Sequence, residues 1–191
     1  MRILILVWGL IVPALATAGS LVFYANAEGE TYDEIAKDLS ATHSAVAQRR
    51  LTNEEFGAML PDTLAAAVHL SKFPIPEHGP AVSIVVNGYV KALVGCMGNC
   101  GVMGYYDPNT KTVYFEEDIL GLPKVYAGGL MVHEFTHYLQ YINGKKFETC
   151  EERRDAEMQA YHVQHEYLVS LGETPSWAWP NHQCGAQEVH D

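Results

Sequence analysis

Positive charge is scarce in this sequence. The chain of 191 residues carries 12 lysines and arginines against 23 aspartates and glutamates, for a formal net charge of -11 at pH 7. A surface with this excess of negative charge is a poor partner for nucleic acid or for an anionic membrane. Internal repeats and low-complexity segments are absent as well, and 48% hydrophobic content suits one core at this length. The sequence therefore predicts a single domain that does not bind nucleic acid.

Charge of either sign is missing from the first part of the chain. The stretch from Ile3 to Ala25 is uncharged and follows Met1-Arg2, the pattern of a secretory signal peptide. It is also long enough for an uncleaved signal anchor, since a transmembrane helix needs about 20 residues. Arg2 before the apolar run and acidic residues after it favour export of the rest of the chain. We expect residues 1–27 to be a signal peptide or anchor and residues 28–191 to form one exported domain, periplasmic or secreted, which contacts a membrane only if the leader stays uncleaved.

Cysteine is also sparse, and no Cys-x-x-Cys pair occurs. The missing pair disfavours a zinc site built from cysteines. An even number of cysteines in an exported chain instead predicts structural disulfides. Of the three possible pairings of the four cysteines we favour Cys96 with Cys100 and Cys150 with Cys184.

The run His133-Glu134-Phe135-Thr136-His137 holds most of the chemical information in the chain. In a helix the two histidines would lie about 40° apart and one turn from each other, so they could share one metal ion. The flanking residues from Gly128 to Ile142 show an apolar helical stripe, and Asn143-Gly144 supplies a helix stop. Two core histidines with satisfied hydrogen bonds and a surface Glu134 form the alternative interpretation.

A third ligand is expected from the helix that comes next in the chain. Thr149 and Glu152 have capping-box spacing and predict a helix from about Cys150 to Leu171, antiparallel to the motif helix. At 1.5 Å per residue this helix regains the level of the histidines near residue 157 or 158. Glu157 is therefore the favoured ligand, because a carboxylate beside the apolar stripe is costly to bury unless it is paired or metal-bound. Glu152 is the second choice, and a salt bridge from Glu157 to Arg153, to Arg154 or to a residue elsewhere is the structural alternative.

Other parts of the chain predict a small α+β domain. Capping boxes predict two helices near residues 32–49 and 53–71, and residues 81–86 predict a buried strand. Residues 101–106 and 111–115 predict a hairpin whose exposed edge could pair with an extended peptide. The acidic residues Glu116, Glu117 and Asp118 after it are expected to form a solvated loop.

The motif, the spacing and the element Glu157-Met158-Gln159-Ala160 together resemble the gluzincins, the thermolysin-like branch of the zinc metallopeptidases. The resemblance covers roughly residues 101–171 and departs from the family at Tyr161, where larger members often have an aspartate that orients a ligand histidine. It implies a minimal zincin-like α+β fold. A small sheet or hairpin would pack on the motif helix and on an antiparallel ligand helix, with helices added at the N-terminus.

The expected chemistry is zinc-dependent hydrolysis of a peptide or protein substrate, with Glu134 accepting a proton from a metal-activated water. Tyr161 shares a helix face with Glu157, and His182 lies in a segment that could fold over the cleft. These two are the candidate donors to the oxyanion, and the zinc ligands are His133, His137 and Glu157. Two alternatives stay open: a non-catalytic exported domain with a structural metal site, and a peptide-binding module that uses the hairpin edge.

Overall fold

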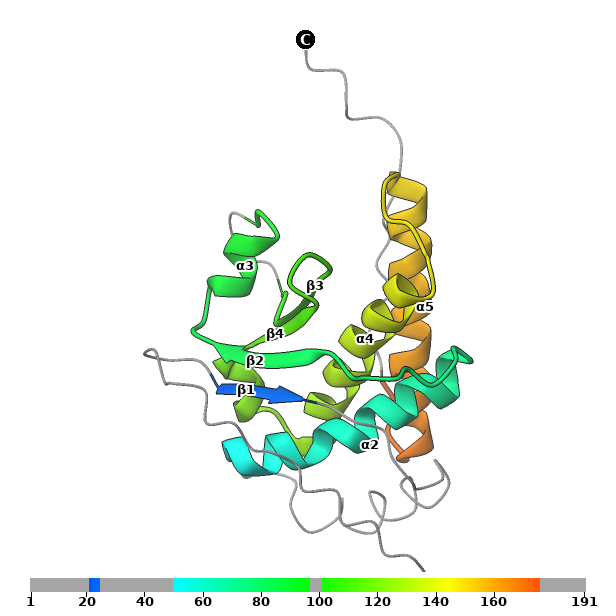
Figure 1. Cartoon of the computed structure of the whole chain (residues 1–191). Coiled ribbons are helices and arrows are strands. Elements are labelled where there is room, and N and C mark those ends of the chain that lie inside the picture. The colour runs from blue at the N-terminus through cyan, green and yellow to red at the C-terminus, as the bar shows by residue number, and fades with distance from the viewer. Residues whose placement is uncertain (1–20, 25–49, 97–100, 176–191) are drawn as a thin grey trace, which may run out of the picture.

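The fold is known from a computed structural model and is described for residues 21–24, 50–96 and 101–175. These residues form a small mixed sheet and a group of helices, which confirms the α+β class (Figure 1). Helix α4 (Lys124–Ile142) contacts the sheet on one side, through β3 and β4, and α5 (Cys150–Ser170) on another. Helix α2 (Asn53–Ser71) packs against both of these helices. The predicted motif helix therefore lies at the centre of the molecule.

The sheet has the strand order β1-β2-β4-β3. The predicted hairpin is confirmed as β3 (Gly104–Asp107) and β4 (Thr112–Glu116), antiparallel with Tyr105 opposite Tyr114. The predicted buried strand is β2 (Ala81–Val85), and it pairs with β4 in parallel. Strand β1 (Leu21–Tyr24) pairs antiparallel with the other side of β2 and lies within the segment predicted to be a leader. Strand β3 is thus the edge strand nearest to α4.

Capping boxes begin two of the helices, as the sequence predicts. At α2, Glu55 N–H donates to Thr52 Oγ1 at 3.2 Å, and Thr52 N–H donates to Glu55 Oε2 at 2.8 Å. At α5 the same exchange joins Thr149 and Glu152, at 3.1 and 3.0 Å. Each box satisfies amide donors that have no partner inside a helix, which fixes where the helix begins.

A short helix and a turn of 3-10 helix complete the described elements. Helix α3 (Tyr89–Leu93) and the 3-10 turn η1 (Glu117–Gly121) were not expected from the sequence. The prediction of a solvated acidic loop is wrong for Glu116. Its side chain is buried and accepts hydrogen bonds from Gly88 N at 2.8 Å and Lys91 N at 3.4 Å. This carboxylate ties the start of α3 to the end of β4.

Two adjacent glycines let α5 lie close against α4. A Cβ atom at Gly128 would stand 2.5 Å from the Tyr167 hydroxyl, and one at Gly129 would stand 3.3 Å from the Leu168 side chain. Gly144, with a φ of 79°, turns the chain after α4, a conformation that glycine adopts without steric cost. The two helices that carry the motif and the predicted third ligand are therefore held side by side.

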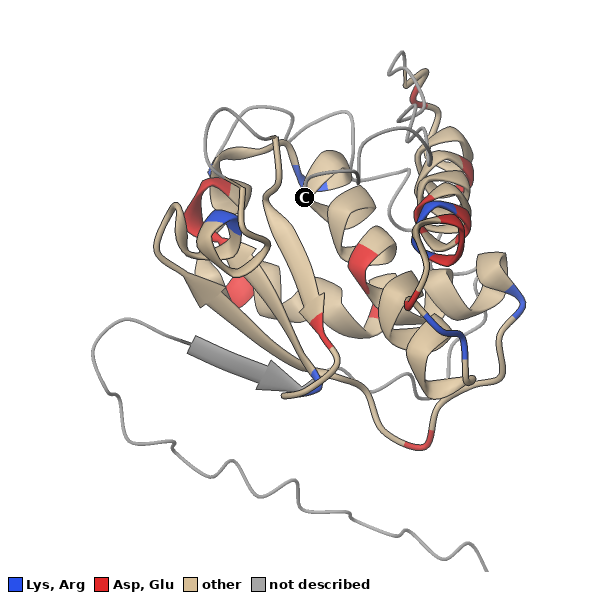
Figure 2. Cartoon of the chain, turned by 90° about the horizontal axis from the view of Figure 1, so that it is seen from above, with Lys and Arg blue, Asp and Glu red and all other residues tan. Residues whose placement is uncertain are grey.

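Some predictions concern residues outside the described part of the chain. The helix near residues 32–49, most of the leader, Cys100, Cys184 and His182 all lie there. Cys96 and Cys150 are not free thiols, and the favoured pairing stays a prediction. Within the described residues no helix is long and apolar enough to cross a bilayer. The lysines and arginines of this part are scattered over separate elements rather than gathered in one patch (Figure 2).

Candidate metal centre

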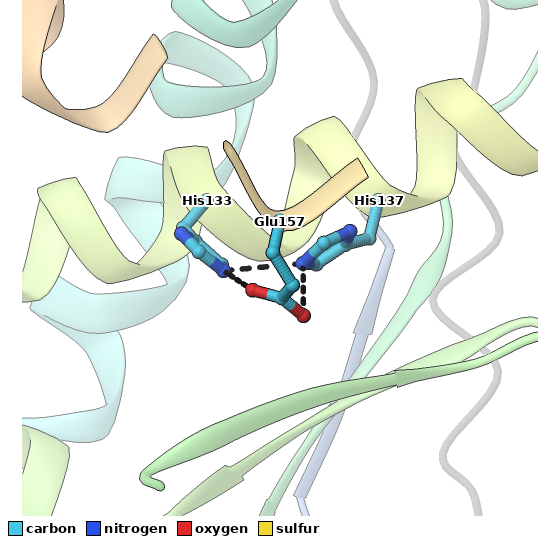
Figure 3. A group of neighbouring side chains, drawn as sticks. All are labelled: His133, His137 and Glu157. Atoms are coloured by element: carbon cyan, nitrogen blue, oxygen red, sulfur yellow. Dashed lines mark hydrogen bonds and ion pairs between the residues drawn. The ribbon is translucent and has the colours of Figure 1, made fainter. Parts of the chain in front are cut away.

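Three side chains from two helices converge at one point. His133 and His137 extend from α4, and Glu157 extends toward them from α5 (Figure 3). The Nε2 atoms of the two histidines are 3.1 Å apart, and each lies 3.4 Å from one oxygen of the Glu157 carboxylate. The ligand atoms all lie within 4.8 Å of one another, so the group could hold a metal ion.

The helix-return geometry that brings Glu157 to the two histidines is confirmed, while Glu152 and the two arginines make other contacts. Glu152, the second choice, has its Oε2 engaged by the amides of Glu148 and Thr149 at 2.9 and 3.0 Å. Arg153 donates to the carbonyl oxygens of Phe147 and Glu148, and Arg154 pairs with Asp155. Neither arginine neutralises Glu157, which leaves its carboxylate to the histidines.

The charges in the cluster are strongly coupled. Burial opposes ionisation of Glu157, but the hydrogen bonds and charges of His133 and His137 outweigh it and hold the pKa of this carboxyl well below its usual range. Burial also opposes protonation of His137, but the Glu157 carboxylate, with Glu134 behind it, raises the pKa of His137 to about 9. The cluster thus attracts positive charge, and a divalent cation would replace the proton that it otherwise holds.

Glu134 lies buried beside the three converging residues, with 7% of its surface exposed. Burial raises the pKa of its carboxyl, and the nearby histidines only partly offset this effect. The backbone N–H of Tyr106 in β3 donates a hydrogen bond to this carboxylate. The edge strand thereby holds a carboxyl group of raised pKa next to the three candidate ligands.

Gly104 in β3 makes room for Glu134. A Cβ atom at this position would stand 2.8 Å from both Cγ and Oε1 of Glu134, closer than such atoms ever approach. A larger residue here would therefore displace either the Glu134 side chain or the strand. Sequence reasoning placed this glycine in a hairpin but missed its role, because the constraint comes from a residue 30 positions away.

Two glutamines hold the outer nitrogens of the histidine rings. His133 Nδ1 lies 3.1 Å from Gln164 Oε1, and His137 Nδ1 lies 2.9 Å from Gln140 Oε1. Both glutamines are buried, with 5% and 0% of their surface exposed. Neither was anticipated from the sequence, although Gln140 follows His137 by three residues and Gln164 follows Tyr161 by three, the spacing of neighbours on one helix face.

Tyr161 lies against the site, as the sequence predicts. Its ring meets that of His133 nearly edge-on, with centroids 4.5 Å apart and an angle of 70° between the planes. Burial, with the charges of Glu157 and Glu134, raises the pKa of its hydroxyl, which therefore keeps its proton. Tyr161 thus places a neutral hydroxyl beside the histidines, and Gln164 Oε1 lies against Nδ1 of His133.

Comparisons of this chain with protein-family models, with curated proteins and with solved structures gave no match. The likeness to the gluzincins therefore depends on the motif residues and their arrangement, and it stays a prediction. The chemistry open to the site is set by the donor atoms that α4 and α5 bring together.

Proposed function

We propose that the protein is a zinc-dependent peptidase with a minimal zincin-like fold. His133, His137 and Glu157 would hold the metal, and Glu134 would act as general base. The observation that carries this proposal is the position of Glu134, a buried carboxylate of raised pKa beside a cluster of three metal ligands. A peptide or protein outside the cytoplasm would be the substrate, because the leader predicts export.

The donor set fits zinc. Two imidazoles and one carboxylate are a common catalytic set for this ion, with bond lengths of about 2.0 to 2.2 Å. Tetrahedral geometry with such bonds separates the ligand atoms by about 3.3 to 3.6 Å. The observed separations are 3.1, 3.4 and 3.4 Å. The three residues therefore need little rearrangement to bind the ion, and three protein ligands leave a coordination position open.

The side chains around the cluster have separate tasks in this mechanism. A zinc ion bound here supplies a Lewis acid that lowers the pKa of water and polarises the substrate carbonyl. Glu134 accepts a proton from the attacking water and passes it to the departing amine. The Tyr161 hydroxyl, which stays protonated, donates a hydrogen bond to the developing oxyanion. His182 is a second candidate donor but lies outside the described residues.

Among the described strands β3 has no neighbour on its outer side, and this edge would offer a binding surface for an extended peptide. The strand order places β3 at the edge of the sheet, and its Tyr106 amide touches Glu134. A substrate strand added to this edge would bring its backbone to the metal cluster. The same edge also favours the second candidate function, a peptide-binding module without hydrolysis. A structural metal site is less well supported, because it would have no use for a buried Glu134 next to an open coordination position.

Metal removal tests the proposal. The purified protein should contain about one zinc ion per chain by plasma mass spectrometry and should cleave members of a broad peptide library. Removing the ion with 1,10-phenanthroline should abolish cleavage, and stoichiometric zinc should restore it. A protein that binds no zinc would refute the proposal. Bound zinc without cleavage would favour the structural site, and peptide binding without cleavage would favour the binding module.

Replacing Gly104 by alanine should slow catalysis without removing the metal. The added Cβ must displace the Glu134 carboxylate, and a misplacement of about 1 Å can lower kcat about 10²-fold. Gly101→Ala is the matched control, because nothing lies within 4 Å of its Cβ position. Measurement of kcat together with zinc content separates the two variants. Equal kcat for both would show that the close approach of β3 does not position Glu134.

A further inference from the structure

We infer that Gln140 and Gln164 are positioning residues that preform the metal centre. Each glutamine fixes one of the two histidines through its Nδ1 atom. Together the glutamines join α4 to α5, so that three donor atoms lie at the separations that one metal ion requires. The inference rests on the metal site of the proposed function and is independent of whether the protein hydrolyses peptides. Neither glutamine would touch the metal or the substrate.

The glutamine oxygens determine which ring nitrogens face the metal. An amide oxygen can only accept a hydrogen bond, so Nδ1 of each histidine must carry the proton. Gln164 Oε1 accepts it from His133 at 3.1 Å, and Gln140 Oε1 accepts it from His137 at 2.9 Å. Each Nε2 atom is then available as a ligand and points toward Glu157, as the distances of 3.4 Å to its carboxylate show.

The same two amides connect the ligand helices in both directions. Gln140 belongs to α4, and its Nε2 donates to the carbonyl oxygen of Ala156 in α5 at 2.9 Å and to Gln159 Oε1 at 3.1 Å. Ala156 immediately precedes Glu157, so this bond fixes the backbone that carries the third ligand. Gln164 belongs to α5 and reaches back to His133 in α4. Hydrogen bonds therefore run from α4 to α5 through Gln140 and from α5 to α4 through Gln164.

Neutral acceptors also preserve the positive charge of a bound ion. A carboxylate behind a ligand histidine makes the ring a stronger electron donor and increases metal affinity. In this chain the two rings are held by uncharged amides, so among the described ligands and their partners Glu157 would supply the one negative charge in contact with a bound ion. Uncharged acceptors would lower the affinity for zinc somewhat and leave a bound ion more electrophilic. This suits an ion that acts as a Lewis acid better than one that only stabilises the fold.

Paired substitutions of Gln164 test the inference. Gln164→Met fills the same space without an acceptor and should weaken zinc binding about 10- to 100-fold, measured by competition with a chromogenic chelator. Gln164→Glu keeps the acceptor and should restore affinity to the wild-type value or above it. In the zinc-loaded wild type, the Nδ1 proton of His133 should give a slowly exchanging NMR signal. That signal should disappear in Gln164→Met and persist in Gln164→Glu.

Asn143→Ala is the control for a purely structural effect. It removes a side-chain amide from the end of α4, where Asn143 donates to the Leu139 carbonyl at 2.8 Å, and should leave zinc affinity unchanged. Unfolding of the metal-free proteins, followed by circular dichroism, shows whether each variant folds. Wild-type zinc affinity in Gln164→Met would overturn this inference but not the proposed function. An equal loss of zinc affinity in Gln164→Met and Gln164→Glu would do the same. A wild-type protein without zinc would refute the proposed function itself.

Discussion

Glu134→Gln is expected to abolish peptide hydrolysis while the metal stays bound. Glutamine has the shape of glutamate, and its amide oxygen can still accept the Tyr106 N–H, so the contact between this side chain and β3 should keep its geometry. The amide cannot accept a proton from water, and loss of a general base lowers the rate by about 10²- to 10⁴-fold. Measuring kcat and zinc content on the same preparation checks both parts of the expectation.

The matched control for this variant is Glu151→Gln, the same chemical change at an exposed position in the first turn of α5. It should cleave peptides at the wild-type rate. Undiminished cleavage by Glu134→Gln would mean that another group accepts the proton. Loss of zinc together with activity would mean that Glu134 supports the metal site rather than the chemistry.

The grouping of His133, His137 and Glu157 was predictable because it depends on helix geometry and on the number of residues between two neighbouring helices. Two histidines four residues apart share a helix face wherever the helix lies, and a capped antiparallel helix must return to their level after a fixed number of residues. These two rules predict that Glu157 joins the two histidines, and the structure brings the three side chains together. Tyr161 also follows, since residues four apart on α5 are neighbours. Its catalytic role is untested and stays part of the proposal.

The glutamines and Gly104 could not be predicted in the same way. A glutamine on a helix is an ordinary surface residue until a tertiary contact buries it, and the burial of Gln140 and Gln164 comes from the close approach of α4 and α5. The role of Gly104 likewise exists only when β3 lies over Glu134. Such constraints belong to pairs of elements, and a pattern within one element does not contain them.

Burial of Glu116 and the parallel pairing of β2 with β4 show the same limit in the fold. The acidic run 116–118 has the composition of a solvated loop, yet Glu116 lies inside because the amides of Gly88 and Lys91 need an acceptor. The chain between β2 and β4 includes α3, a helix too short for hydrophobic periodicity to reveal. By contrast, the bounds of α2 and the start of α5 were predicted well, because side-chain caps fix helix ends locally.

Glu157→Gln should remove the metal. Zinc binding to four protein ligands has an apparent free energy of about 10 to 16 kcal/mol, so one lost ligand should lower the affinity by about 10²- to 10³-fold. Glutamine is close to glutamate in size but offers a neutral and weaker oxygen donor. Competition with a chromogenic chelator measures the change. The substitution Glu166→Gln, at a half-exposed position on the same helix, is the control and should bind zinc normally.

The same substitution should also change how the metal-free protein responds to pH. Glu157 raises the pKa of His137 to about 9, so their interaction stabilises the fold fully below the unfolded-state value of about 6.5 and is lost as pH rises through 9. The metal-free wild type should therefore lose stability between pH 6.5 and 9.5 in urea unfolding. In Glu157→Gln the charge that favours protonated His137 is gone while the burial that opposes it remains, so this loss should disappear. An equal loss in both proteins would mean that His137 and Glu157 do not share a proton. Zinc would then displace no proton from this pair when it binds.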